Sequence, residues 1–418
     1  MDALCSGDLF QASGRQTSLR VATAQDRERR VLLETIANFH MLGAIQGSVL
    51  AAALAMRRQN SLANKLLSVW IALLSIDLIS EFLMEKQFYL AFPHIIGATH
   101  SFPLFYGPLF FLYTRTLIST NPSLPGRQLL HFLPFLLHQL YFVPSFYVQS
   151  GAFKLQFMQD MMDQGPPAFI PVSTALKILH GFIYVVATLL LLRTHARAVR
   201  DSFSNLGEVS LSWLHVLTAL QVAIWGTALA VNLLEYLGVA LAAELSDGPI
   251  YVVAGVMVYV IGFFALRQPE IFLQGTQPAA DAPTDVSPEA SAPQKYEKTR
   301  LDEDKAQQYL QDLLDHMEEE RPFIRSTLTL QELSDELSIA SHQLSQVIND
   351  RLQKNFFDFI NGYRVKEVQT RLLAPEAQNL TILAVALDSG FSSKSSFNTI
   401  FKKHTQMTPS QFKRSSGD

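Results

Sequence analysis

The chain has 418 residues, enough for two or three domains, and 49% of them are apolar. Its formal net charge of −4 averages over unlike segments, because charged residues are sparse between about residues 39 and 272 and common elsewhere. The single cysteine, Cys5, excludes an internal disulfide framework and a cysteine-based metal site.

Residues 1–38 form an N-terminal tail that carries five arginines and lacks the layout of a cleavable signal peptide. Arginines favour the cytoplasmic side, whereas an odd number of membrane crossings before a cytoplasmic C-terminus would put this tail outside. We expect that translation begins at Met41, where MLGAIQGSVLAAALAM opens the first apolar run. The tail would then not be translated.

Seven long apolar runs follow, separated by short loops with Pro, Gly or charge, at residues 39–56, 66–84, 95–117, 129–147, 172–192, 211–237 and 248–272. Most have the length of about 17–25 residues that a helix needs to cross a hydrocarbon layer. The alternative, a large soluble helical bundle, requires a polar stripe on each helix. No such stripe is visible in LLSVWIALLSIDLISEFLM or GPIYVVAGVMVYVIGFFAL. The sequence therefore predicts an all-α fold with a seven-span transmembrane domain at residues 39–272.

The basic residues beside these runs are unevenly distributed, and the translocation of Lys and Arg is disfavoured. The first, third and fifth loops are the basic ones, with Arg57, Arg58, Lys65, Arg115, Arg127, Arg193, Arg197 and Arg200. We expect these loops on the cytoplasmic side. Seven crossings then place the C-terminal third there as well.

Two connecting segments precede the C-terminal domain. Residues 273–300 are rich in Pro, Ala, Asp and Ser, which predicts a flexible linker. Residues 301–323 are predicted to form an amphipathic connecting helix with an acidic outer face, because apolar side chains recur at helical spacing: Tyr309, Leu310, Leu313, Leu314 and Met317.

Residues 324–418 repeat one pattern of two short helices. The segment TLTLQELSDELSIASHQLSQVIND has an apolar face on either side of a turn near Ser338, which is helix-turn-helix spacing. The pattern returns at a constant offset of 52 residues, so that Leu330, Leu333, Ser334 and Ser338 correspond to Ile382, Val385, Ala386 and Gly390. Gly390 can adopt the positive φ of a tight turn. A long helix with Asn355 as its N-cap is predicted between the repeats, and a last short helix after Thr408.

The motif I-x-x-V-A-x-x-x-G-F begins at Ile382, and Phe397, Phe401, Lys402, Lys403, Thr408 and Pro409 follow it. With these residues, the last ninety or so positions resemble the AraC/XylS family of bacterial transcription regulators. LSQVIND, NFFDFINGYR, the run from KYEKTRLDEDKA and GPLFFLYTRTL resemble the subgroup whose N-terminal half is embedded in a membrane. The resemblance implies promoter binding by two helix-turn-helix units and altered recruitment of RNA polymerase.

Three positions depart from the family pattern. Gln406 stands where a glycine is usual, which costs about 1 kcal/mol if the site needs a left-handed turn. Ala340 occupies the usual serine cap of the first recognition helix, so that we expect Ser341 to take over the cap. Ser334 replaces an alanine.

The resemblance also implies which residues contact DNA. Mapped by motif, the base-reading residues are His342, Ser345, Gln346 and Asn349 in the first unit and Lys394, Ser395, Asn398 and Thr399 in the second. Phosphate contacts are expected from Arg351, Lys354, Lys402, Lys403, Lys413 and Arg414. For any one of these residues the alternative is an ordinary solvated helix face.

Polar residues within membrane spans are costly and suggest function. A candidate sensor pocket comprises Asp77, Glu81, His100, Asn232 and Glu235, while His131, His138, Lys177 and His180 are open to the alternative of hydrogen-bonded packing. No catalytic nucleophile with a base, no metal-ligand spacing and no cofactor motif is recognisable, so enzyme activity is not expected.

The combined prediction is a multi-pass protein of the bacterial cytoplasmic membrane with its C-terminus in the cytoplasm. A membrane signal or small molecule would control promoter binding, with RNA polymerase, membrane lipid and a second copy of the chain as further partners. One alternative is a transporter with an autoregulatory DNA-binding domain, although no duplicated halves are visible. Another is a tethered architectural DNA-binding protein without a ligand.

Overall fold

The structure is a computed structural model, and it describes residues 31, 34–57, 61–119, 122–207, 211–239, 248–267, 302–375 and 380–415. Within these residues the regular elements are helices, together with one isolated antiparallel bridge between Phe203 and Thr329. The chain divides into two compact units. The first comprises Met1–Leu190 and Trp213–Gln277, and the second comprises Leu191–Ser212 and Pro278–Asp418.

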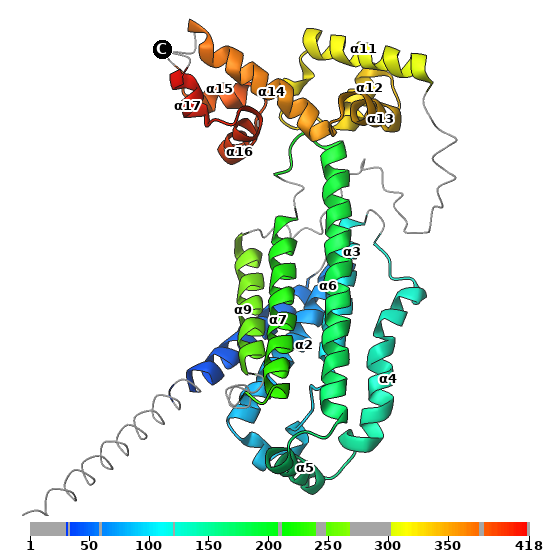
Figure 1. Cartoon of the computed structure of the whole chain (residues 1–418), viewed down its shortest axis with the longest axis vertical. Helices are drawn as coiled ribbons and strands as arrows, with labels where there is room; N and C mark the ends of the chain where they lie inside the picture. The colour runs from blue at the N-terminus through cyan, green and yellow to red at the C-terminus, as the bar shows by residue number, and fades with distance from the viewer. Residues whose placement is uncertain are drawn as a thin grey trace, which may run out of the picture. The chain divides into compact units, whose positions relative to one another are not determined.

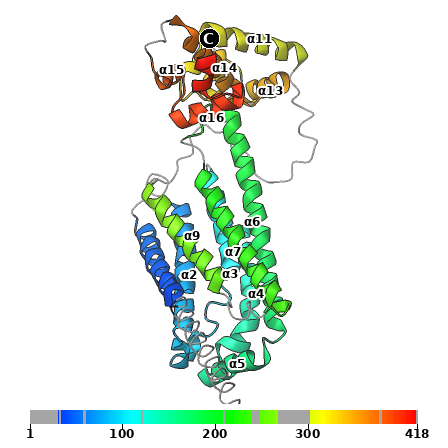
Figure 2. The same ribbon diagram turned by 60° about the vertical axis from the view of Figure 1, so that its left-hand side comes forward.

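The first unit is built from helices that lie alongside one another (Figures 1 and 2). The first of them is Glu34–Ala55. The others are α2 (Leu62–Glu85), α3 (Pro103–Ile118), α4 (Leu133–Phe142), α5 (Gly151–Gln164), α6 (Phe169–Ser202), α7 (Ser212–Tyr236) and α9 (Gly248–Arg267). Short helical turns lie at Phe88–Leu90, Pro93–Ile95, Gly126–Phe132 and Val143–Tyr147.

As far as the structure describes them, the seven apolar runs fall mainly on helical segments, but not all of these segments are long enough to cross a membrane. By length and composition, five segments of the described chain qualify: Glu34–Ala55, Leu62–Glu85, Gly126–Tyr147, Phe169–Ser202 and Ser212–Tyr236. The apolar part of α9, Gly248–Phe264, is shorter. The helix of the third run, α3, has 16 residues.

Two of the helices differ in extent from the apolar runs that contain them. The third run starts as turns rather than helix, because Gly97 has a φ of 71° and the helix begins only at Pro103, whose fixed φ suits a first helical position. The fifth apolar run ends at residue 192, and α6 continues for ten further residues to Ser202. The extension, which contains Arg193, Arg197 and Arg200, has no Gly or Pro to end it.

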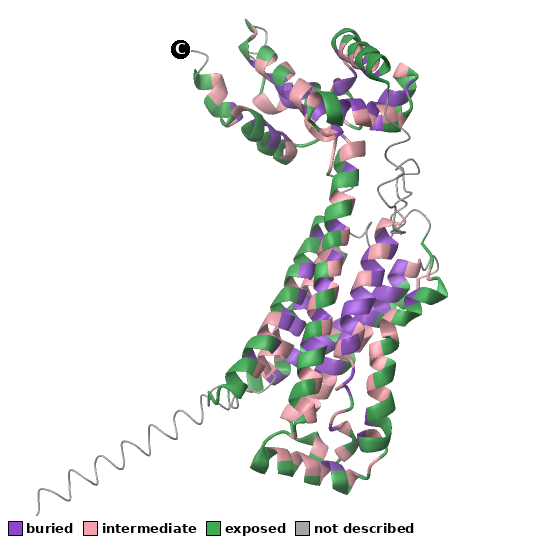
Figure 3. Ribbon diagram, turned by 45° about the vertical axis from the view of Figure 1, so that its right-hand side comes forward, coloured by how far each residue is buried: buried purple, intermediate pink, exposed green. Residues whose placement is uncertain are grey.

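Aromatic side chains fill the interior of the first unit. Trp70 of α2 is fully buried and its ring centroid lies 5.0 Å from that of Phe110 on α3. Trp213, also buried, lies 6.0 Å from Tyr113. Exposed residues, many of them apolar, recur along these helices (Figure 3). Apolar side chains therefore lie on the outside of this unit as well as in its core.

Besides the last part of α6, the described residues of the second unit form a connecting helix and six further helices. They are α11 (Glu303–Glu319), α12 (Leu330–Leu337), α13 (Ser341–Leu352), α14 (Phe356–Leu373), α15 (Ile382–Asp388), α16 (Lys394–Thr405) and α17 (Pro409–Ser415), with a short turn at Pro322–Ile324. The predicted connecting helix at 301–323 is therefore α11 plus that turn. The predicted linker at 273–300 lies outside the described residues.

Helix α14 joins two hydrophobic cores, as its position between the other helices indicates (Figure 1). Its first half contributes Phe356, Phe359 and Ile360 to a core shared with α11, α12 and α13. Its second half contributes Val365, Val368 and Leu372 to a core shared with α15 and α16. Each helix-turn-helix unit thus has its own core, and one rigid element connects them.

The N-terminal tail lies almost wholly outside the described residues, and a start at Met41 stays a prediction. The helix Glu34–Ala55 begins upstream of that position. Ala37 and His40 on its first turns are buried, and the imidazole of His40 lies 3.3 Å from the carboxylate of Glu85.

Candidate nucleic-acid interface

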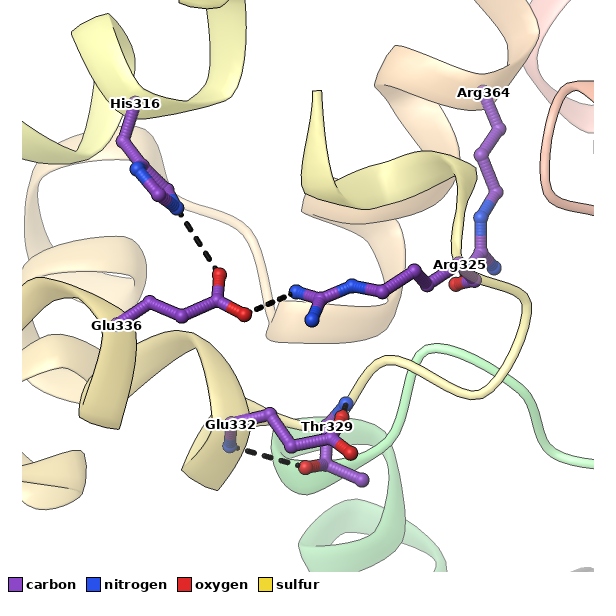
Figure 4. Close-up of polar contacts among 6 residues, drawn as sticks. All are labelled: His316, Arg325, Thr329, Glu332, Glu336 and Arg364. Atoms are coloured by element: carbon purple, nitrogen blue, oxygen red, sulfur yellow. Dashed lines mark hydrogen bonds and ion pairs between the residues drawn. The ribbon is translucent and has the colours of Figure 1, made fainter. Parts of the chain in front are cut away.

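The two helix-turn-helix units form by local rules that the sequence displays. Thr329 and Glu332 make a reciprocal capping box at the start of α12 (Figure 4), and Thr381 caps α15 in the same place of the second unit. The predicted turns are confirmed, since Ser338 has a φ of 57° and Gly390 a φ of 94°. The predicted N-cap of α14 is also confirmed, because the Asn355 side chain accepts from the Asp358 N–H at 2.8 Å.

The cap of the first recognition helix differs from the prediction. Helix α13 starts at Ser341, with Ala340 as a residue before it that offers no side-chain cap. Ser341 does not replace that cap, because its hydroxyl donates to Gln331 Oε1 at 2.6 Å. The hydroxyl is therefore used to tie α13 to α12. In the second helix-turn-helix unit the Ser393 side chain does cap α16, because it accepts a hydrogen bond from the Ser396 N–H.

Helices α13 and α16 each bury one face and expose the other. Leu344, Val347 and Ile348 of α13 and Phe397, Ile400 and Phe401 of α16 are buried. Among the predicted base-reading residues Ser345 and Gln346 are partly buried, whereas the remaining six are exposed: His342, Asn349, Lys394, Ser395, Asn398 and Thr399. Every predicted base-reading side chain is thus on an accessible face of the second helix of its unit.

The residues predicted to contact phosphate differ in how free they are. Lys354, Lys402 and Arg414 are exposed. Arg351, by contrast, donates from Nη2 to Glu303 Oε2 at 2.5 Å, and Lys403 Nζ lies 2.7 Å from Asp358 Oδ1. These two cations already have carboxylate partners, which DNA phosphates would have to displace.

A groove of about 760 Å³ runs beside the C-terminal half of α16. Four of the predicted DNA-contacting residues line it, namely Asn398, Thr399, Lys402 and Lys403, and it continues over the start of α17 through Gln406, Thr408 and Ser410. Thr408 and Pro409 begin α17 as predicted. Lysines and amides on one open groove are the chemistry that holds a phosphate backbone.

Helix α14 contains a buried charged residue, Arg364, that sequence reasoning did not single out. Arg364 is 2% exposed, and burial lowers the pKa of its guanidinium to about 10. Nε donates to the Phe323 carbonyl at 2.8 Å, and Nη2 donates to the Arg325 carbonyl at 2.7 Å, which brings Arg364 beside Arg325 in Figure 4. The signal in the sequence was an arginine within the apolar pattern of α14, between Tyr363 and Val365.

A small ionic cluster connects α11 to α12. Glu336 lies between two basic side chains, with Oε2 3.1 Å from His316 Nε2 and Oε1 2.6 Å from Arg325 Nη2 (Figure 4). Burial favours the protonated form of Glu336, but the hydrogen bonds and charges of these two partners outweigh it and hold its pKa below the ordinary value. The connecting helix is thereby bonded to the first helix-turn-helix unit.

In the first unit the five candidate sensor residues do not share one set of contacts. The Tyr106 hydroxyl donates to Asp77 Oδ2 at 2.5 Å, and both side chains are buried. His100 instead contacts Lys177 Nζ at 3.2 Å. Asn232 donates to the carbonyl of Ala228 on its own helix.

The remaining sensor candidates are more open to the surroundings, since Glu235 is exposed and Glu81 only partly buried. Beside His100, a network of polar groups converges on the hydroxyl of Ser101, which lies within 2.9 Å of His138, Gln139 and Tyr147. Ser101 and Tyr147, whose hydroxyls take part in this network, were not among the predicted pocket residues. Within the described residues no cluster of three or more His, Cys, Asp or Glu side chains has the arrangement of a metal site.

Comparison with known proteins agrees with the C-terminal geometry. Residues 333–415 match the family described as helix-turn-helix domain. HTH-type transcriptional regulators of Staphylococcus aureus strains COL and MSSA476, both uncharacterised, are each 34% identical over 86 residues. That match covers 21% of this chain and 11% of each relative, so the chain spans only about a tenth of the length of these curated relatives.

A solved structure from Listeria innocua, of a protein with unknown function, is 27% identical and covers 25% of this chain and 94% of that one. Its TM-score is 0.23, so the likeness carries no argument about the fold. The family match covers α13, α14, α15, α16 and α17. The C-terminal part of this chain is a helix-turn-helix domain of the kind found in transcriptional regulators.

Proposed function

We propose that this chain is a membrane-anchored, one-component transcription regulator of the AraC/XylS type, in which a signal at the membrane domain controls promoter binding. The observation that carries the proposal is the paired arrangement of α13 and α16. Each is the second helix of a helix-turn-helix unit, buries an apolar face and exposes polar side chains. Two such helices read two segments of major groove.

Side-chain chemistry supports a division of labour on these helices. Gln346, Asn349 and Asn398 carry a donor and an acceptor in one amide, which matches the edge of adenine. Lys394 at the start of α16 suits guanine or phosphate. The groove beside α16 suits the backbone, with Lys402 and Lys403 as its cations.

The outer surface of α6 supports a membrane location. Apolar side chains that are each more than half exposed alternate by four and three positions along one helical face: Val172, Leu176, Leu179, Ile183, Val186 and Leu190. From Val172 to Leu190 a helix rises about 27 Å at about 1.5 Å per residue. A hydrocarbon layer is about 30 Å thick, so lipid would cover this stripe along its length.

The division of the chain into units supports the proposed topology. Residues 191–212, which include three exposed arginines, belong to the same unit as the helix-turn-helix domain. Between these residues and that domain the chain contains the apolar helices α7 and α9. Two crossings would return the chain to the side that it left. If basic loops stay on the cytoplasmic side, residues 191–212 and the helix-turn-helix domain both lie in the cytoplasm.

The signal is proposed to act on the polar groups buried in the first unit. Two groups are candidates, the Asp77 and Tyr106 pair and the network around His100, Lys177 and Ser101. A small molecule or a property of the lipid bilayer is the proposed input. RNA polymerase and a second copy of the chain are the proposed partners on the promoter.

Selection of DNA from a random duplex library by the full chain in lipid nanodiscs tests the DNA-reading part. We expect one enriched site with two half-sites, and Gln346→Ala and Lys394→Ala should each weaken its binding at least tenfold. Gln343→Ala on α13 and Lys305→Ala on α11 are matched controls of the same residue types outside the predicted set, and they should stay within twofold of the wild type. Enrichment of no sequence by the wild type would contradict the proposal.

A further inference from the structure

The segment that follows α6 is anchored within the second unit. Phe203 forms an antiparallel bridge with Thr329, just before α12. Ser204 is 1% exposed, and its N–H and its hydroxyl both donate to the Leu328 carbonyl, at 3.2 and 2.6 Å. We call Phe203 and Ser204 the latch. Its backbone and side chain are both held by the first helix-turn-helix unit.

The latch also completes the hydrogen bonding of the buried Arg364. A guanidinium has five N–H donors. Nη1 of Arg364 donates to the Ser204 carbonyl at 3.0 Å and Nη2 donates to the Ser204 hydroxyl at 3.0 Å. The other three donors reach the Phe323 carbonyl, the Arg325 carbonyl and Asn361 Oδ1. All five donors are thus satisfied by neutral oxygens, and two of those oxygens come from the latch.

Removal of the latch would leave a buried cation with two unpaired donors. An unpaired donor on a buried charged group is costly, and the cost is relieved only if water enters or the side chain moves. Asn361 would lose a partner as well, because its Nδ2 donates to the same Ser204 carbonyl at 3.1 Å. An undocked latch would therefore require different surroundings of Arg364 from those of the docked latch.

Arg364 lies where the two DNA-binding units meet. On α14 it follows the residues of the first core and precedes those of the second. The turn of the second helix-turn-helix unit lies against Arg364 and Phe323. A Cβ on Gly390 would lie 2.4 Å from the Phe323 carbonyl oxygen and 3.0 Å from Arg364 Nε. A rearrangement of the guanidinium or of Phe323 toward Gly390 would therefore push on the turn of the second helix-turn-helix unit.

Helix α6 leads directly into the latch. It is continuous from Phe169 to Ser202, and Ser204 lies two residues beyond its end. Buried side chains recur along α6 at intervals of seven residues, at Ile178, Val185, Leu192 and Val199. A continuous helix transmits a rotation or a shift along its axis, whereas a chain with the composition of residues 273–300 relaxes it.

We propose that the latch is a regulatory switch through which movement of α6 sets the relative arrangement of the two helix-turn-helix units and so controls binding to a two-part DNA site. This inference rests on the proposed function. With the latch docked, the two recognition helices are held at one spacing. Binding to DNA then loses no free energy to the ordering of one helix relative to the other. With the latch released, each unit still binds its own half-site, but the joint affinity falls.

Ser204→Ala in the full chain in lipid nanodiscs tests the docked state, with the DNA site obtained by library selection. We expect the dissociation constant for the two-part site to rise at least tenfold and that for a single half-site to change less than twofold. Ser334→Ala is the matched control, since Ser334 is equally buried but its hydroxyl donates to the Leu330 carbonyl of its own helix. Equal effects of Ser204→Ala on the two-part site and on the half-site would overturn the latch.

A reversible cross-link separates release of the latch from misfolding. In a Cys5→Ser background, Phe203→Cys and Thr329→Cys place two thiols across the antiparallel bridge. Added to Ser204→Ala, the oxidised pair should restore affinity for the two-part site, and reduction should remove it again. A failure of oxidation to restore affinity would overturn the proposal. If the wild type bound neither the two-part site nor the half-site, the proposed function would fail instead.

Insertions of one alanine test the route of the signal. An insertion after Arg197 rotates the latch by about 100° relative to the preceding part of α6, whereas one after Ala279 lengthens the segment predicted to be flexible. The readout is transcription of a reporter that carries the selected site, in cells with the full chain. We expect the α6 insertion to change expression at least tenfold and the other to change it less than twofold. Equal responses to the two insertions would overturn the proposal.

Discussion

Gln406 at the end of α16 shows how one residue sets local stability. Its φ is 60°, a left-handed conformation that a Cβ disfavours and that glycine adopts freely. The departure from the family pattern thus falls on a position that does need a left-handed turn. One hydrogen bond offsets part of the strain, from Gln406 Nε2 to the Lys403 carbonyl at 3.0 Å.

Gln406→Gly is expected to stabilise the second helix-turn-helix unit by about 0.5–1 kcal/mol, since relief of the left-handed strain exceeds the loss of an exposed hydrogen bond. Hydrogen exchange of the α16 amides in the full chain, followed against urea concentration, measures the change. Gln353→Gly is a second case of the same kind, because Gln353 ends α13 with a φ of 52°. A loss of protection in both variants would contradict the prediction.

Glu336 predicts a pH dependence in the acid range. Its folded pKa lies below the ordinary 4.5. Its contribution to stability is therefore complete above pH 4.5 and is lost as the pH falls from there through the lower folded pKa. Glu336→Gln should flatten the fall in stability of α12 below pH 4.5, measured by hydrogen exchange corrected for intrinsic rates. Glu320→Gln, which alters an exposed carboxylate at the end of α11, should leave the fall unchanged.

At the scale of elements, two neighbouring lysines of α16, Lys402 and Lys403, lie in different surroundings. Both line the groove beside α17. Both lysines are exposed, and Lys403 also forms an ion pair with Asp358 at the start of α14. A phosphate that binds Lys403 must compete with that carboxylate, so the two cations should not contribute equally to DNA affinity.

Lys402→Ala is expected to reduce the slope of log affinity against log salt by about 0.9, as for one lost phosphate contact. Lys403→Ala should reduce it by less, and Asp358→Asn should raise DNA affinity because it frees Lys403. Titrations of the selected duplex between low and moderate salt measure all three. Identical slopes for the two lysine variants would show that the ion pair has no influence on binding.

For the whole molecule, the arrangement of the helices in the bilayer is the main prediction. The proposed topology places α6, α7 and α9 as the last three crossings, with the loop after α6 and the C-terminus on the cytoplasmic side. In that topology lipid would cover the exposed apolar stripe of α6 along about 27 Å, taken at about 1.5 Å per residue. An exposed apolar surface of that extent is typical of a membrane or protein interface.

Reporter fusions in bacteria test this topology. A fluorescent protein that matures only in the cytoplasm should be active when fused after Ser415, and alkaline phosphatase at the same position should be inactive. Fusions in the loop between α7 and α9 should show the opposite pattern. Alkaline phosphatase activity after Ser415, or extraction of the full chain from membranes by carbonate, would contradict the prediction.

The sequence by itself determined the elements whose signals are local. Apolar runs predicted the helices of the first unit, and a repeat at 52 residues predicted α12 with α13 and α15 with α16, because side-chain periodicity and caps act over a few residues. The residues expected on the exposed faces of α13 and α16 came from the family resemblance. The sequence did not determine the details at helix ends. Helix α6 extends beyond its apolar run, and α13 starts without a side-chain cap at Ala340.

Only the tertiary structure decided which distant residues meet. Ser204 and Arg364 are 160 positions apart, and nothing in the residues around either one indicates the other. The same holds for Arg351 with Glu303 and for Lys403 with Asp358, where an exposed cation in the sequence proves to have a partner. A buried guanidinium is stable only where the whole fold supplies its acceptors, so its role becomes visible when all of those acceptors are in place.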